Sequence, residues 1–175
     1  MVKRMRRTLI VIDMQNDFID GALGTKEAQA IIENVYQVIQ SFEGEVVFTR
    51  DTHFENYADT QEGKKLPIPH CIKGTNGWQI NSKLKNLIKP ETKIFDKITF
   101  GSTELTEYLK NNKELEKVTL AGLCTDICII SNALLIKANL PEVEIEVLEN
   151  CCAGVTPESH INALNAMKMC QISVK

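Results

Sequence analysis

Short apolar runs alternate with amphipathic helical patterns along the chain. Runs such as TLIVID (8–13) and EVVFT (45–49) are typical of strands buried on both faces. The helical stretches place apolar residues three or four positions apart, as in 31–39. We expect strands over 8–13, 45–49, 93–95, 117–121, 143–148 and 171–174, and helices over 26–42, 81–88, 102–111, 126–138 and from 156 onward. This alternation predicts an α/β fold with a mostly parallel sheet and helices on both faces.

Polar residues with chemical potential follow several of these strands. In open parallel α/β sheets, sites gather at the carboxyl ends of the strands. The stretch 50–77 is long and polar, and a loop of that length inside a compact domain is usually functional. We therefore expect convergence at one sheet edge of the residues that follow the strands: Asp13, Asp51, His53, Asp96, Lys97 and 124–128.

Composition sets the size of the domain and argues against some partners. A chain of 175 residues, 43% of them hydrophobic, fits one domain over 1–175 with a substantial core. A net charge of −3 gives no basic footprint for nucleic acid or an acidic membrane. The basic run Lys3, Arg4, Arg6 and Arg7 precedes a strand too short for a signal segment or a membrane span. We expect neither nucleic acid nor membrane as a partner.

Six cysteines occur, and an even number invites a disulfide framework. We instead expect reduced thiols and a cytoplasmic protein, because the chain is large enough for a real core and shows no secretory signal. A zinc–cysteine site is also disfavoured, because the sequence contains no CxxC pair. The cysteines are Cys71, Cys124, Cys128, Cys151, Cys152 and Cys170.

Three residues after strands form one candidate catalytic set. Cys128 falls in the first turn of a predicted helix, where unpaired amides lower a thiol pKa and can hold an oxyanion. Asp13 would accept the thiol proton, and the charge of Lys97 would favour a thiolate. Each residue also has an ordinary reading: a buried structural cysteine, a turn-capping aspartate and a solvated lysine. Cys124, in the same turn, is a competing nucleophile.

A second set is typical of a metal site. Asp51 and His53 are alternate residues after a strand, so their side chains point to the same side. His70 follows in the same polar stretch, and Glu62 between them is a candidate fourth ligand. Imidazole and carboxylate ligands suit zinc, iron or manganese, although a polar loop that happens to contain histidines is the plain alternative. The third histidine, His160, is expected to be a solvated surface residue.

Several motifs together match one known family. The chain resembles the isochorismatase-like cysteine hydrolases, and within them the nicotinamidase group, over nearly its whole length and in the same order. Six motifs in register are far more specific than any single one. The matching segments are VIDMQNDF (11–18), TRDTH (49–53), PHCIKGT (69–75), DK (96–97), AGLCTDICI (121–129) and CAGVTPESH (152–160).

The resemblance implies a three-layer α/β/α sandwich with a Rossmann-like sheet, in an enzyme that is usually oligomeric. It implies that Cys128 is the nucleophile, with Asp13 and Lys97 as its catalytic partners. The amides of Cys124 and Cys128 would form the oxyanion hole, after a cis peptide between Leu123 and Cys124.

The resemblance also implies that Asp51, His53 and His70 bind a divalent metal, zinc in the first instance and otherwise iron or manganese. Glu62 is a weaker match, because the fourth ligand varies in the group. The family usually has a small residue such as Ala where this chain has Cys124. The stretch after Lys97 is short.

Two phenylalanines are assigned to the substrate pocket. Phe100 is expected to replace the aromatic wall that a longer loop after Lys97 carries in many nicotinamidases. Phe18 closes the first motif and is assigned to the same pocket.

The expected reaction is hydrolysis of nicotinamide to nicotinate and ammonia through a cysteine thioester. The alternatives are a related hydrolase acting on another small amide or ureido compound, and a non-catalytic binding protein. The intact set of Asp13, Lys97 and Cys128 argues against the last of these.

Overall fold

Burial on both faces of the sheet explains the four successive apolar residues, 9–12, of the first strand. In β1 (Arg7–Ile12), Leu9 and Val11 pack into one hydrophobic cluster, while Ile10 and Ile12 pack into another on the opposite face. Successive side chains of a strand point to opposite faces, so a strand with helices on both sides is apolar at every position. The computed structural model describes residues 6–175.

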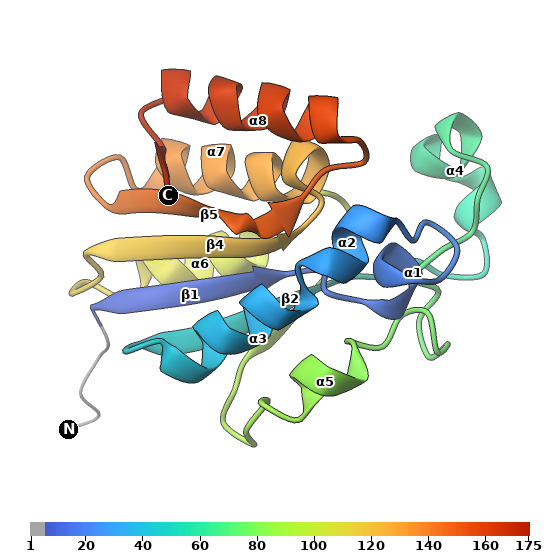
Figure 1. The fold of residues 1–175 in the computed structure, drawn as a ribbon, viewed down its shortest axis with the longest axis horizontal. Coiled ribbons are helices and arrows are strands. Elements are labelled where there is room, and N and C mark those ends of the chain that lie inside the picture. The colour runs from blue at the N-terminus through green and yellow to red at the C-terminus, as the bar shows by residue number, and fades with distance from the viewer. Residues whose placement is uncertain (1–5) are drawn as a thin grey trace.

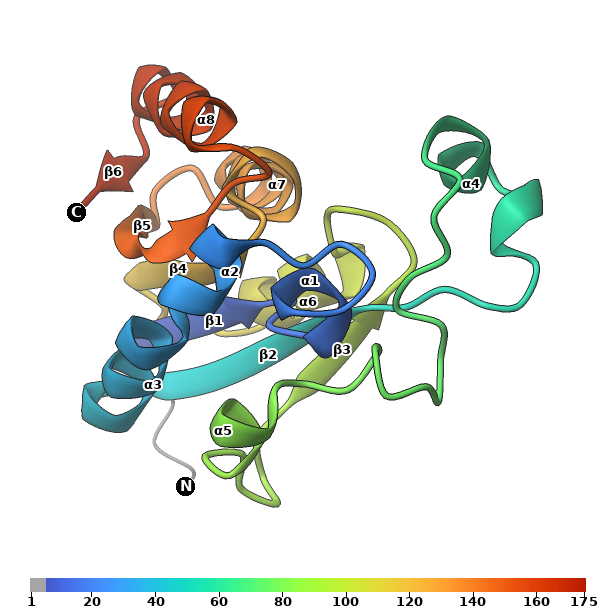
Figure 2. The ribbon, with the colours of Figure 1, turned by 45° about the vertical axis from the view of Figure 1, so that its right-hand side comes forward.

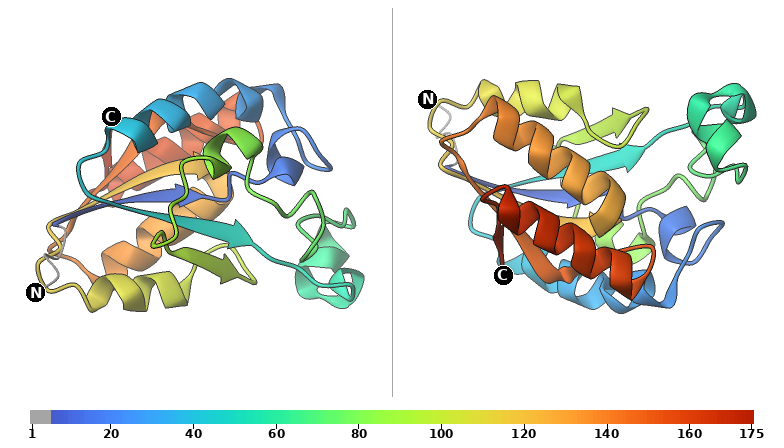
Figure 3. Two further views of the ribbon diagram at one scale, coloured as in Figure 1. Left: turned by 90° about the horizontal axis from the view of Figure 1, so that it is seen from below. Right: turned by 90° about the horizontal axis from the view of Figure 1, so that it is seen from above.

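The described strands form one six-stranded parallel sheet in the order β3-β2-β1-β4-β5-β6. Figure 3 shows the sheet between its two helical layers. The mostly parallel α/β/α sandwich is therefore confirmed. After β1, the strands are β2 (Glu45–Asp51), β3 (Ile94–Lys97), β4 (Lys117–Leu123), β5 (Glu144–Ala153) and β6 (Ser173–Val174).

Helices cover both faces of the sheet (Figure 1). The cluster around Leu9 takes side chains from the short helices early in the chain, and the cluster around Ile10 takes them from the later ones. The first group is α1 (Asn16–Ile19), α2 (Lys26–Ala30), α3 (Ile32–Ser41) and α5 (Ser82–Lys85). The second is α6 (Thr103–Lys110), α7 (Ile130–Asn139) and α8 (Pro157–Met169).

Two segments differ from the expected elements because tertiary context overrides local pattern. The single helix expected over 26–42 is broken at Ile31, although neither Pro nor Gly is present there. The helix expected over 126–138 begins instead as a π-helix, η2 (Thr125–Ile129), which continues directly into α7.

The stretch 50–77 is not a bare loop. β2 extends to Asp51, and the excursion that follows contains the 3-10 helix η1 (Tyr57–Asp59) and helix α4 (Gln61–Lys65). The hydroxyl of Thr60 accepts a hydrogen bond from Gly63 N and so caps α4. Figure 2 shows α4 set apart from the sheet, beyond the carboxyl ends of β2 and β3.

The basic run at the N-terminus is described in part. Lys3 and Arg4 lie outside the described residues, whereas Arg6 pairs with Glu116 at 2.9 Å. Over residues 6–175, the structure contains no helix of the length and apolar character needed to cross a membrane.

Candidate active site and metal centre

The carboxyl edge of the sheet brings most of the expected residues together. Asp96 is the exception, because it alternates with Lys97 along β3 and is exposed. Asp13 follows β1 directly, and Asp51 and Lys97 are the last residues of neighbouring strands, where they are register partners. Cys128 lies one turn beyond the end of β4. Four adjacent strands, β3, β2, β1 and β4, therefore bring four side chains to one point from four separate parts of the sequence.

Asp13, Lys97 and Cys128 form a buried group, which we call the thiol cluster. Lys97 Nζ lies 2.6 Å from Asp13 Oδ2 and 3.5 Å from Cys128 Sγ. The three residues are 0%, 4% and 5% exposed. Lys97 is therefore no solvated surface lysine, and its charge is available to an anion that forms on the thiol or the carboxyl group.

Asp13 is held in place by the end of β2. Thr49 Oγ1 donates a hydrogen bond of 2.6 Å to Asp13 Oδ1, and Thr49 O accepts one of 3.3 Å from Asp13 N. The backbone of Asp13 is left-handed, with φ of 49°, which a residue with a side chain rarely adopts. Such strained positions persist where the surroundings enforce them and concentrate at functional sites.

The protonation state of the thiol differs from the sequence-based expectation. Burial raises the pKa of Cys128 well above that of a free thiol, and the charge of Lys97 opposes this only in part. Burial likewise raises the pKa of Asp13, again opposed by Lys97. Desolvation therefore acts against the lowering of the Cys128 pKa that was expected from helix amides. The thiol needs a base, and Asp13 is beside it.

Cys128 lies in a tight turn of residues 122–128, and we call this segment the Cys128 turn. Gly122 has φ of 125°, and a Cβ there would lie 2.0 Å from the carbonyl oxygen of Ile12 on β1, so only glycine fits. The peptide bond between Leu123 and Cys124 is cis, as the resemblance implied. Burial raises the pKa of the Cys124 thiol to about 12, so a raised pKa is common to both thiols. What distinguishes Cys128 is the ammonium group of Lys97 at 3.5 Å from its sulfur.

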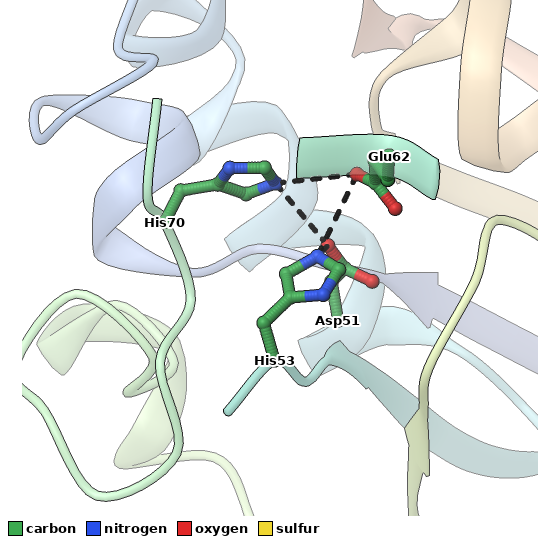
Figure 4. A group of neighbouring side chains, drawn as sticks. All are labelled: Asp51, His53, Glu62 and His70. Atoms are coloured by element: carbon green, nitrogen blue, oxygen red, sulfur yellow. Dashed lines mark hydrogen bonds and ion pairs between the residues drawn. The ribbon is translucent and has the colours of Figure 1, made fainter. Parts of the chain in front are cut away.

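Four side chains converge beside the thiol cluster, and we call them the ligand cluster: Asp51, His53, Glu62 and His70 (Figure 4). His53 Nε2 lies 2.9 Å from Asp51 Oδ2 and 3.6 Å from Glu62 Oε1. His70 Nε2 lies 3.6 Å from each of the same two oxygens. One donor atom from each residue lies within 4.8 Å of all the others.

The chemistry of these donors fits a divalent cation. His70 Nδ1 lies 2.8 Å from the carbonyl oxygen of Ile68, which favours the tautomer that leaves Nε2 free to bind a metal. Burial raises the pKa of Glu62, and so does the charge of Asp51, so two carboxyl groups crowd one space. A cation would relieve this repulsion. Two imidazoles and two carboxylates suit zinc, iron or manganese.

The return of the chain at His70 is fixed by backbone pairing. His53 N donates to Cys71 O, and Lys73 N donates to His53 O, so these two parts of the excursion form a short parallel bridge. Asp51 links this arrangement to the thiol cluster, because its Oδ1 lies 3.3 Å from Lys97 Nζ.

Sequence reasoning assigned no role to Gln15 or Asp17, which support the ligand cluster. The buried amide of Gln15 accepts a hydrogen bond from Asp51 N and donates to Asp51 O and Trp78 O. Asp17 Oδ2 accepts a hydrogen bond of 2.7 Å from Cys71 N, beside His70. Both residues belong to the segment VIDMQNDF (11–18), and their place in this matching motif could have indicated a role in the site.

The two phenylalanines assigned to the pocket lie in different surroundings. The ring of Phe18 is buried and lies 5.5 Å, centroid to centroid, from His70. Phe100 is 40% exposed, and its carbonyl accepts a hydrogen bond from Asn132. Its place in the pocket wall stays a prediction.

The expectation for His160 is wrong. This residue is only half-exposed, and its Nδ1 lies 2.7 Å from the hydroxyl oxygen of Thr125. The polar start of a helix misled the sequence reading, because the opposite side of that helix start faces the Cys128 turn.

Comparison with known proteins now places the chain. The isochorismatase domain matches residues 7–174, and the chain belongs to the isochorismatase family. It is 32% identical over 175 residues to the uncharacterized isochorismatase family protein PncA of Bacillus subtilis (strain 168), covering 92% of this chain and 93% of that protein.

Solved structures add the group within the family. The pyrazinamidase/nicotinamidase of Streptococcus mutans UA159 superimposes with a TM-score of 0.84 at 30% identity, covering 97% of this chain and 99% of that one. The zinc complex of Pyrococcus horikoshii pyrazinamidase gives 0.81 at 27% identity, covering 97% and 98%. N-carbamoylsarcosine amidase of Thermoplasma acidophilum gives 0.82 at 25% identity, covering 98% and 96%. These similarities confirm the resemblance to the nicotinamidase group and support an amide-hydrolysing enzyme.

Proposed function

We propose that this protein hydrolyses nicotinamide to nicotinate and ammonia through a thioester on Cys128. The observation that carries the proposal is that the thiol cluster and the ligand cluster are adjacent. Asp51 of the ligand cluster contacts Lys97 of the thiol cluster. The first cluster supplies a nucleophile with its base, and the second supplies a place for a group that orients the substrate.

In the first half of the reaction, Cys128 Sγ attacks the amide carbon. Asp13 accepts the thiol proton during attack and gives it to the nitrogen as the C–N bond breaks, so ammonia leaves and the acyl group remains on sulfur. The raised pKa of Asp13 suits this exchange, because a more basic carboxylate is a better acceptor from a thiol. Lys97 stabilises the negative charge as it passes between sulfur and carboxylate.

In the second half, Asp13 accepts a proton from water, whose oxygen attacks the thioester. Nicotinate forms, and the proton returns to Cys128 as the C–S bond breaks. Both tetrahedral species carry an oxyanion, which we assign to the backbone amides of Cys124 and Cys128. Donors fixed in advance at such a position are among the largest contributions to acyl-transfer catalysis.

The ligand cluster would hold a divalent cation through Asp51, His53, Glu62 and His70. When bound, this ion supplies an open coordination position for the pyridine nitrogen and so orients the ring without taking part in acyl transfer. Zinc is our first candidate, since it is present in the structurally similar pyrazinamidase from Pyrococcus horikoshii. Iron and manganese suit the same donors.

A second candidate substrate class is favoured by one observation. The fold matches N-carbamoylsarcosine amidase as well as it matches pyrazinamidases, with a TM-score of 0.82 against 0.81 and 0.84. The thiol cluster would cleave the C–N bond of a ureido compound by the same steps.

An ammonia-release assay on a small panel tests both candidates. The panel contains nicotinamide, pyrazinamide, an N-carbamoyl amino acid and maleamate, each offered to protein loaded in turn with zinc, iron or manganese. We expect turnover of nicotinamide to exceed that of the non-aromatic amides by at least tenfold. Preference for the ureido substrate would move the function to the second candidate, and no release from any compound would refute hydrolysis.

Two further properties complete the proposal. We place the enzyme in the cytoplasm, where thiols stay reduced, because the six cysteines are unpaired in the structure. We also expect a homo-oligomer, as the resemblance implied, and sedimentation of the purified protein measures it.

A further inference from the structure

The connection between β5 and α8 is the matching segment to which sequence reasoning gave no chemical role. It covers CAGVTPESH (152–160) and ends at His160, on the first turn of α8. His160 Nδ1 lies 2.7 Å from Thr125 Oγ1. Thr125 is fully buried and is the first residue of the π-helix that carries Cys128.

A second contact joins the same two segments. The carboxylate of Asp126 accepts a hydrogen bond from Val155 N, with both oxygens at 3.2 Å. Within the connection itself the backbone packs closely, because a Cβ on Gly154 would lie 2.8 Å from His160 N and 2.9 Å from His160 Cα. The Cys128 turn is thus held from outside at two successive residues.

The element that holds the turn is itself well fixed. Thr156 caps α8 by accepting a hydrogen bond from Ser159 N, and Ser159 Oγ accepts one from Thr156 N in return. Pro157 at the first helical position sets the backbone for the helix. His160 is therefore presented from a helix start whose backbone has little freedom.

The direction of the Thr125 hydroxyl is the informative detail. A threonine hydroxyl in or near a helix commonly satisfies itself on a nearby backbone group. Here it meets an imidazole from another element instead. The contact suits either tautomer of the ring, because a hydroxyl group can donate to a bare Nδ1 or accept from an Nδ1 that carries hydrogen.

We propose that His160 is a positioning residue for the proposed reaction. By holding Thr125, it fixes the start of the π-helix, and with it the amides assigned to the oxyanion and the direction of Cys128 Sγ. The proposal rests on Cys128 being the nucleophile. Small displacements of such groups are costly, since an error of about 1 Å can reduce turnover by about 100-fold.

The test compares two single variants and their combination, with the metal-loaded full chain and the best amide of the panel. His160→Ala removes the imidazole, and Thr125→Val removes the hydroxyl while keeping the side-chain shape. We expect each to lower kcat by about 10- to 100-fold with KM changed by less than about twofold. The double variant should lose no more than the worse single one, because both remove the same contact.

Two controls separate positioning from stability. Thr125→Ser keeps the hydroxyl and should retain most of kcat. Met167→Ala removes buried packing near the other end of the same helix without touching Thr125 or the helix start, so it should lower the melting temperature and leave kcat within about twofold of wild type. Melting curves of all variants are recorded beside the kinetics, and Thr125→Val serves if His160→Ala does not fold.

Three results would overturn the proposal: kcat of His160→Ala within twofold of wild type, losses that multiply in the double variant, or an equal loss of kcat in Met167→Ala. The failure of the proposed function looks different. It would be shown by full activity in Cys128→Ala, or by a wild-type protein inert toward the whole panel.

Discussion

The two clusters at the carboxyl edge are built in opposite ways. The thiol cluster draws Asp13, Lys97 and Cys128 from segments far apart in the sequence, each placed at or just beyond the end of a strand. The ligand cluster draws its members from one continuous stretch, residues 51–70. Asp51 ends β2, and His53, Glu62 and His70 lie on the excursion that leaves the sheet and returns. The sheet fixes the first, and the local pairing of His53 with Cys71 and Ile72 fixes the second.

This difference assigns different tasks to the two clusters. Acyl transfer needs reacting groups held within a fraction of an ångström, and strand ends hold side chains more firmly than loops do. Orientation of a substrate tolerates a more adaptable frame. We therefore expect damage to the thiol cluster to lower kcat, and damage to the ligand cluster to raise KM.

The largest expected effect separates the two clusters most cleanly. Cys128→Ala should lower ammonia release by roughly 10⁴-fold or more, because no thioester can form. The same variant should keep its metal content, measured by elemental analysis, since Cys128 is not in the ligand cluster. Cys124→Ala is the matched control and should retain a measurable fraction of activity. Full activity in Cys128→Ala would remove the thiol from the mechanism.

Asp13→Asn should lower kcat by roughly 10²- to 10⁴-fold without unfolding the protein, because the amide keeps the shape and cannot accept a proton. The measurement is steady-state kinetics beside a melting curve. An Asn variant with normal turnover would leave Asp13 a structural residue only.

The pH profile sharpens the assignment of Asp13. A protonated carboxyl group cannot accept the thiol proton, so kcat/KM should fall as pH falls through the Asp13 pKa. Because burial raises that pKa, the fall should begin above the range of an ordinary aspartate, about 3.9. The acid limb should be absent from the residual activity of Asp13→Asn. An identical limb in that variant would assign it to another group.

The combined variant His53→Ala/His70→Ala tests the other side of the comparison. It should lose the bound ion, expected at about one per chain, and raise KM for nicotinamide by roughly 10- to 100-fold, while kcat changes less. Elemental analysis and kinetics measure both, and chelation of wild-type protein should reproduce the effect. Unchanged nicotinamide kinetics without metal would favour the ureido substrates instead.

The smallest expected effect concerns the fourth ligand. Glu62→Gln should weaken metal binding by about tenfold, less than loss of both histidines, because Asp51 and two imidazoles remain. Glu55→Gln is a matched control, since Glu55 is an exposed carboxylate of the same excursion. Metal titration of the two variants makes the comparison. Equal affinities would remove Glu62 from the ligand set.

The elements at the centre of the sheet were predictable because burial on both faces leaves an unbroken apolar run, as in 8–13. Convergence at the carboxyl edge followed from parallel topology, which brought Lys97 to Asp13. Local pattern failed where packing decides the backbone. No distinctive residue in the sequence predicts the helix break at Ile31 or the π-helix that begins at Thr125.

The site was predictable in its members and less so in its electrostatics. The motif spacing identified Cys128 as the candidate nucleophile. The pKa of its thiol, however, depends on burial by segments far away in the sequence, and the residues around Cys128 do not reveal that burial. His160 was misread for a related reason. A polar helix start looks solvated in sequence, and only the fold reveals that Thr125 lies opposite.

The bridge between His53 and Ile72 has a consequence for tolerance to insertions and deletions. It closes the excursion at its base, so residues between the two ends form a loop whose closure entropy grows slowly, by about 0.6 kcal/mol for each doubling of length. Lengthening or shortening around α4 should leave Asp51, His53 and His70 in place and move Glu62 alone. A change of loop length in this excursion would therefore replace the fourth ligand without disturbing any strand of the sheet.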